Sequence, residues 1–117
     1  MTMLRLKRAY DPPLEDDGFR ILVDGIWPRG MKREQIQIDL WLKDVAPSDE
    51  LRRWFGHDPG RWGAFKERYH GDLASKGDLI ALISEKISSG DVTLVFGAKD
   101  EKFNNAVALK EYLLRED

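Results

Sequence analysis

The chain has 117 residues, a formal net charge of −2 and no cysteine. This length predicts a single domain, residues 1–117, that folds without disulfides or a structural metal. The absence of cysteine excludes thiol nucleophiles, iron–sulfur clusters and thiolate zinc sites, and the acidic balance disfavours non-specific binding to nucleic acid. Residues 1–8 lack the apolar core of a signal peptide, and no apolar run reaches the roughly 20 residues of a membrane-spanning helix. We therefore expect a cytoplasmic protein without membrane contact.

Three segments have the pattern of β-strands. Residues 3–9 alternate apolar and polar side chains, which predicts an edge strand with one exposed face. Residues 19–26 and 92–96 are more continuously apolar, as is typical of strands covered on both faces. Residues 10–18 contain two prolines and three consecutive acids, so we expect them to form a surface connection with little to bury.

Apolar residues spaced by three and four predict helices over much of the remaining chain. Residues 31–36 favour a short helical turn, and apolar side chains at positions 38, 41, 42 and 45 predict an amphipathic helix that ends before Pro47. Four further helices are expected to begin near Ser48, Asp58, Gly77 and Phe103. Strands separated by helices imply an α/β fold with a small, mostly parallel sheet of about three strands, covered by four to five helices.

Polar side chains follow each of the three predicted strands. They are Arg8 and Tyr10 after the first, Asp24, Trp27 and Arg29 after the second, and Lys99, Asn104 and Asn105 after the third. The carboxyl ends of parallel strands meet at one edge of a sheet, where open α/β folds bind ligands, so these side chains should form one cluster. Its three cations outnumber its one acid, which suits a phosphate or carboxylate group. We predict a pocket for a small anionic ligand.

Several roles are open to the residues of this cluster. Asp24 is a candidate general base, a candidate metal ligand, or the ion-pair partner of Arg29. Asn104 and Asn105 can cap the last helix, direct amide groups at a ligand, or do both. Trp27 can stack on a ligand or close the end of the sheet. No activated nucleophile is visible, so catalysis stays an open question, and we predict neither a metal site nor a cofactor.

Other aromatic and basic side chains have simpler interpretations. His57 stands beside Asp58, but adjacent residues rarely form the hydrogen bond that orients a catalytic histidine, and Asp58 is expected to cap a helix. We therefore expect no catalytic role for His57. Three of the four tryptophans fall on apolar helical faces and are expected in the core: Trp41, Trp54 and Trp62.

Four motifs along the chain carry a resemblance to a known family. They are LVDGIWPRG at residues 22–30, WLKDVAP at 41–47, WFGHDP at 54–59, and VTL at 92–94 followed by AKD at 98–100 and NNAV at 104–107. In this order they resemble the YeaO-like proteins, short bacterial and archaeal members of domain-of-unknown-function family 488. The family has no settled activity, so the resemblance implies a family and not a function.

The chain departs from the longer members of that family in two places. Those proteins carry a cysteine at the end of the last strand and a Cys-His-Arg run at the start of the following helix. Here the strand ends with Phe96 and Gly97, and the helix begins with Phe103, Asn104 and Asn105. Their cysteine chemistry therefore does not transfer to this chain, and Lys99 is the cation near that helix.

A second function is also open, namely an interaction surface for a protein or nucleic acid partner. It would combine Trp27 with five basic residues: Arg29, Lys32, Arg33, Arg52 and Arg53. The two functions differ in salt dependence, because binding to a polyanion weakens steeply as salt rises, whereas binding in a small pocket depends on salt far less. The sequence makes no prediction about the oligomeric state.

Overall fold

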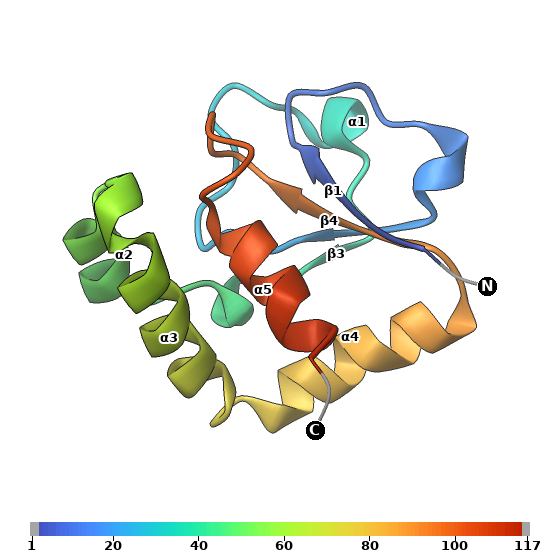
Figure 1. The fold of residues 1–117 in the computed structure, drawn as a ribbon. Coiled ribbons are helices and arrows are strands. Elements are labelled where there is room, and N and C mark those ends of the chain that lie inside the picture. Colours follow the sequence, from blue (N-terminus) through green and yellow to red (C-terminus); the bar gives the residue numbers. More distant parts are fainter. Residues whose placement is uncertain (1–2, 116–117) are drawn as a thin grey trace.

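A computed structural model of the chain describes residues 3–115. Its centre is a four-stranded sheet with the order β1-β4-β2-β3, in which every pair of neighbours is parallel (Figure 1). The strands are β1 (Leu4–Arg8), β2 (Phe19–Leu22), β3 (Leu40–Trp41) and β4 (Val92–Phe96). The predicted α/β class and parallel sheet are confirmed, with β1 at an edge as expected and with one strand more than expected.

Helices make most of the connections between these strands. The α-helices of the described residues are α1 (Arg33–Ile36), α2 (Asp49–Phe55), α3 (Trp62–Leu73), α4 (Gly77–Ser89) and α5 (Asn105–Leu113). Short 3₁₀-helices are η1 (Glu15–Asp17), η2 (Lys43–Val45) and η3 (Pro59–Arg61). The predicted caps are confirmed for Ser48, whose Oγ accepts from the Leu51 amide, and for Asp58, whose Oδ1 accepts from the Gly60 amide. No helix within residues 3–115 has the length and apolar character that crossing a bilayer requires.

The two faces of the sheet have unequal cover. Figure 1 shows α4 and α5 on one side of the sheet and α1 on the other. On β4, Val92, Leu94 and Phe96 belong to the larger core, together with residues of α2, α3, α4 and α5. Val95 of β4 and Leu22 of β2 belong to a smaller core on the opposite face. This alternation is the two-residue period of a strand buried on both sides.

The amphipathic helix predicted over residues 38–45 is wrong. The segment forms β3 and η2, and the Leu42 amide donates to a carbonyl of β2 at 3.0 Å. Its apolar side chains divide between the two faces of the sheet, because Ile38 and Trp41 pack in the smaller core whereas Leu42 and Val45 lie in the larger one. A helix would have placed all four on one face. The need to cover both sides of the sheet therefore overrides the helical spacing.

The connection between β1 and β2 also differs from the prediction, because one of its acids is buried. Asp17 is 2% exposed, and its carboxylate accepts from Lys7 Nζ at 2.8 Å and from Arg20 Nη1 at 2.6 Å. Arg20 is itself 3% exposed and donates to the Ile36 carbonyl at 2.9 Å. Burial raises the pKa of Asp17, but hydrogen bonds from Lys7 and the Leu14 amide and the contacts with both cations outweigh it, and the pKa lies below its usual value.

We expect Asp17→Ala to lower the free energy of unfolding by about 3–5 kcal/mol, because the change leaves Arg20 buried without a counter-charge. Chemical denaturation at neutral pH measures this loss. Asp16→Ala is the matched control: Asp16 is an exposed acid in the same turn, and its removal should change stability by no more than about 0.5 kcal/mol. An equal loss in both variants would contradict a stabilising role for the Asp17 ion pairs.

Candidate functional site

The carboxyl ends of β1, β2 and β4 meet at one edge of the sheet, as the parallel arrangement requires. Three hydrogen bonds join the segments that follow these strands. They run from Arg8 Nε to the Ala98 carbonyl at 2.9 Å, from the Tyr10 hydroxyl to the Arg29 carbonyl at 3.0 Å, and from the Gly97 amide to Asp24 Oδ2 at 2.8 Å. Loops that are far apart in the sequence therefore converge at this edge.

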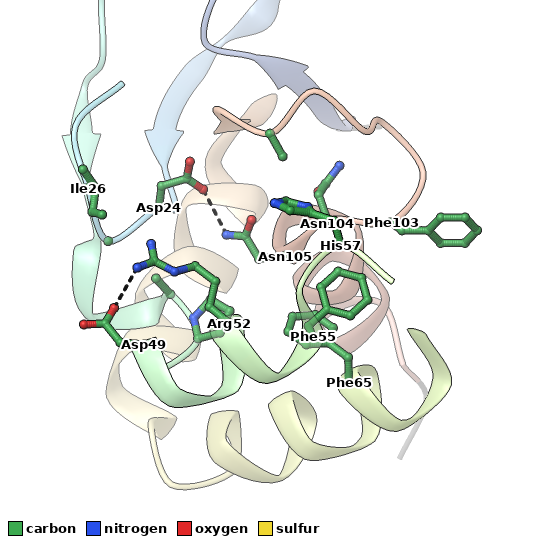
Figure 2. Close-up of a pocket in the computed structure, with 14 residues that line it drawn as sticks. Asp24, Ile26, Asp49, Arg52, Phe55, His57, Phe65, Phe103, Asn104 and Asn105 are labelled. Atoms are coloured by element: carbon green, nitrogen blue, oxygen red, sulfur yellow. Dashed lines mark hydrogen bonds and ion pairs between the residues drawn. The ribbon is translucent and has the colours of Figure 1, made fainter. Parts of the chain in front are cut away.

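A cavity of about 210 Å³ opens between this edge, α2 and the start of α5 (Figure 2). Apolar side chains form most of its lining, with rings contributed by Phe55, Phe65 and Phe103. The polar residues of the lining are Asp24, Asp49, Arg52, His57, Asn104 and Asn105. The volume is below the roughly 300–1,000 Å³ of pockets that take drug-sized molecules, so a ligand enclosed here would be small.

Asp24 is the half-buried acid on the sheet side of this cavity, two residues beyond β2. Its Oδ2 accepts from the Gly97 amide at 2.8 Å, and its Oδ1 accepts from Asn105 Nδ2 at 3.1 Å. The indole of Trp41 holds its backbone carbonyl at 2.7 Å. Burial raises the pKa of Asp24, and the hydrogen bonds from Gly97 and Asn105 and the charge of Arg52 offset this only in part, so the pKa stays above its usual value.

The ion pair considered between Asp24 and Arg29 is not formed. Arg29 is exposed. The Tyr10 hydroxyl donates to its backbone carbonyl and does not contact its guanidinium. Within residues 3–115, Asp24 makes no ion pair with any cation. The cavity thus contains a half-buried carboxylate that is hydrogen-bonded but not paired with a positive side chain.

The two asparagines at the start of α5 have different roles. Asn104 is the N-cap: its Oδ1 accepts from the Val107 amide at 3.0 Å, and its Nδ2 donates to the Asp100 carbonyl at 2.8 Å. Asn105 instead points back to the sheet, where its Nδ2 donates to the Val23 carbonyl and to Asp24. Both asparagines line the cavity; the capping role is confirmed for Asn104, whereas Asn105 orients Asp24.

The remaining predicted residues lie at the same edge but outside the cavity lining. The Arg8 guanidinium stacks on the Tyr10 ring, 5.2 Å from its centroid. Lys99 is exposed. Trp27 is half-buried against Trp41, with ring centroids 5.4 Å apart, and its indole N–H donates to the backbone of the following loop. Trp27 therefore packs at the end of the sheet.

Three polar residues of the cavity lining were not predicted to belong to it, namely Asp49, Arg52 and His57. Arg52 lies on α2 with its side chain half exposed, and its Nη2 binds Asp49 Oδ1 at 3.1 Å. His57 follows α2 with a φ of 57°, and its ring centroid lies 6.2 Å from that of Phe55. None of the three lies directly after a strand, so the rule that ligands bind beyond strand ends did not identify them. The WFGHDP motif contains His57, but the resemblance assigned it no role.

Comparison with known proteins identifies the family. Residues 3–117 match the model described as the inactive DUF488-N3 subclade. The chain belongs to the DUF488 family. It is 38% identical over 94% of its length to the uncharacterised protein YeaO of Escherichia coli strain K12, of which the match covers 96%. It is also 43% identical to the uncharacterised protein Rv3073c of Mycobacterium tuberculosis, over 69% of each chain. No solved structure gives a significant match.

We expect the side-chain carboxyl signal of Asp24 in NMR to titrate above 3.8, the usual pKa of an aspartate. The folded state then holds the proton more tightly than the unfolded state, so the contribution of Asp24 to stability is greatest at low pH and declines as pH rises from 3.8 through the folded pKa. Asn105→Ala removes a hydrogen bond to the ionised form and should raise this pKa further. Arg29→Ala should leave the pKa of Asp24 unchanged. A higher pKa in that variant would indicate that Asp24 and Arg29 do form an ion pair.

Proposed function

We propose that this DUF488 protein binds a small anionic ligand, one that carries a carboxylate or phosphate group, in the cavity between β2, β4, α2 and α5. The observation that supports this most directly is the position of the cavity. It lies beyond the carboxyl ends of parallel strands, where open α/β folds bind ligands, and Arg52 is part of its lining.

Several positive groups favour an anion in this position. Arg52 uses one N–H in its contact with Asp49, and its planar guanidinium has further donors available for a carboxylate or phosphate. Arg8, Arg29 and Lys99 add positive charge at the same edge, which would attract an anion from solution.

Binding is better supported than catalysis. The subclade whose model matches the chain is described as inactive. The lining contains no serine, threonine or lysine that could act as a nucleophile. Within residues 3–115, His57 forms no hydrogen bond with a carboxylate: Asp58 caps η3, and Asp100, whose carboxylate interacts electrostatically with His57, accepts instead from the Lys102 and Phe103 amides. Asp24 remains the candidate general base, because a raised pKa brings a carboxylate closer to the range in which it accepts protons efficiently.

The structure gives less support to the alternative, an interaction surface built around Trp27. The ring of Trp27 is half-buried against Trp41, and its N–H is already bound to the Met31 carbonyl at 2.7 Å. Arg52, which was assigned to that surface, instead lines the cavity. The surroundings of Trp27 and the position of Arg52 therefore favour the pocket over the interaction surface.

We expect a thermal-shift screen of small carboxylates, phosphates and nucleotides to find a compound that stabilises the wild-type protein. Arg52→Gln should weaken its binding about tenfold or more, the effect of losing one hydrogen bond to a charged group. Lys102→Gln is the matched control, because Lys102 is an exposed cation in the neighbouring loop and lies outside the lining. Its binding should equal that of the wild type.

Two outcomes would contradict the pocket. If Arg52→Gln and Lys102→Gln both bind like the wild type while Arg29→Ala loses the ligand, the anion binds beside Arg29 at the edge of the sheet, outside the cavity. If no small anion binds, but RNA or DNA is retained in a way that salt abolishes, the interaction surface is the better explanation.

A further inference from the structure

Within residues 3–115, the acid Asp24 in the cavity forms no ion pair, and the charge of Arg52 offsets its burial only in part. An ionised carboxylate has about four lone-pair sites, and Asp24 uses two of them for the Gly97 amide and Asn105 Nδ2. Charges that proteins remove from water are normally paired, yet within residues 3–115 no cation pairs with Asp24. The free acceptor sites and the missing charge both suit a cation supplied by a ligand.

Asn105 provides a second acceptor beside Asp24. Its Nδ2 donates to the Val23 carbonyl at 3.1 Å, and because a carbonyl can only accept, this contact identifies which end of the amide is the nitrogen. The opposite end, Oδ1, is therefore an acceptor, and it forms no hydrogen bond within the described part of the chain. Figure 2 shows the side chains of Asp24 and Asn105 joined by their hydrogen bond, with the Arg52 side chain below them and bound to Asp49.

We infer that the anionic ligand of this cavity is a zwitterion, namely a free α-amino acid with an apolar side chain. Its ammonium group binds Asp24 and Asn105 Oδ1, and its carboxylate faces Arg52. This inference rests on the proposed function, because it names the ligand class of the same cavity. The three N–H donors of a primary ammonium match the acceptors available. Phe55 and Phe103 provide apolar surface for the ligand's side chain.

Other small charged ligands fit this lining less well. A phosphate dianion would meet two acids, Asp24 and Asp49, with Arg52 as the one arginine of the lining. A magnesium or calcium ion takes six or more oxygen ligands, whereas the free acceptors here are those of one carboxylate and one amide. The raised pKa of Asp24 is also the expected state of a half-buried carboxylate whose cation is absent.

The test compares three compounds that share one side chain, using calorimetry on the full chain. A thermal-shift panel of apolar amino acids first selects the side chain, with leucine as the example here. Leucine should bind about tenfold or more tightly than 4-methylpentanoate, which lacks the ammonium group, and than leucinamide, which lacks the carboxylate. Asp24→Asn should abolish the advantage of leucine over 4-methylpentanoate. Arg52→Gln should abolish its advantage over leucinamide, and Lys102→Gln should change neither.

An NMR titration of Asp24 in the wild-type protein tests the same contact without a substitution. A bound ammonium favours the ionised carboxylate, so the amino acid should lower the pKa of Asp24, whereas a bound carboxylate alone should raise it.

The calorimetry distinguishes failure of this inference from failure of the proposed function. If 4-methylpentanoate binds as tightly as leucine, the zwitterion is wrong and the anion pocket stands. If leucinamide binds as tightly as leucine, the carboxylate contributes nothing to binding, and both the zwitterion and the anion pocket are wrong. If no apolar amino acid binds while other anions do, only the zwitterion is overturned.

Discussion

The parallel pairing of β4 with both β1 and β2 is the constraint on which the rest of the structure depends. All five residues of β4 are buried, and Phe96 at its end lies level with Arg8 of β1. The segments that follow the three strands must therefore leave the sheet at the same edge. A shift of one residue in this register would exchange the two faces of β4 and place the polar Thr93 in the larger core. The register is thus fixed by burial, and with it the position of Asp24.

Periodicity in the sequence predicted the elements whose apolar residues serve one core. It identified β4, α3 and α4, and local capping chemistry located the start of α2 at Ser48. Periodicity failed over residues 38–45, whose apolar spacing is typical of a helix. There Ile38 and Trp41 pack on one face of the sheet, whereas Leu42 and Val45 pack on the other. It also failed at Asp17, because a run of three acids indicates a solvated loop unless Lys7 and Arg20 are known to converge on it. Both errors concern long-range contacts that no local pattern contains.

The same distinction applies to the candidate site. The rule that ligands bind beyond the ends of parallel strands correctly brought Asp24 and Asn105 together, because the sheet alone determines where these residues lie. Arg52 and His57 reach the cavity from α2, whose position depends on its packing against α3. Gly97 allows this arrangement because it has no side chain. A Cβ at this position would lie 3.2 Å from Asp24 Oδ2, so a glycine permits the end of β4 to approach that carboxylate closely.

The carboxylates of Asp17 and Asp24 have different electrostatic surroundings in this fold. Asp17 is surrounded by Lys7 and Arg20, so its charge is compensated within the chain and its pKa falls. Burial raises the pKa of Asp24, and within residues 3–115 the carboxylate receives hydrogen bonds but forms no ion pair, so its ionised form costs stability at neutral pH. Replacing Asp24 with a neutral residue would remove that cost, because no ion pair compensates the charge in the part of the chain that the structure describes. This cost is the physical reason for our proposal that a ligand in the cavity neutralises the charge of Asp24.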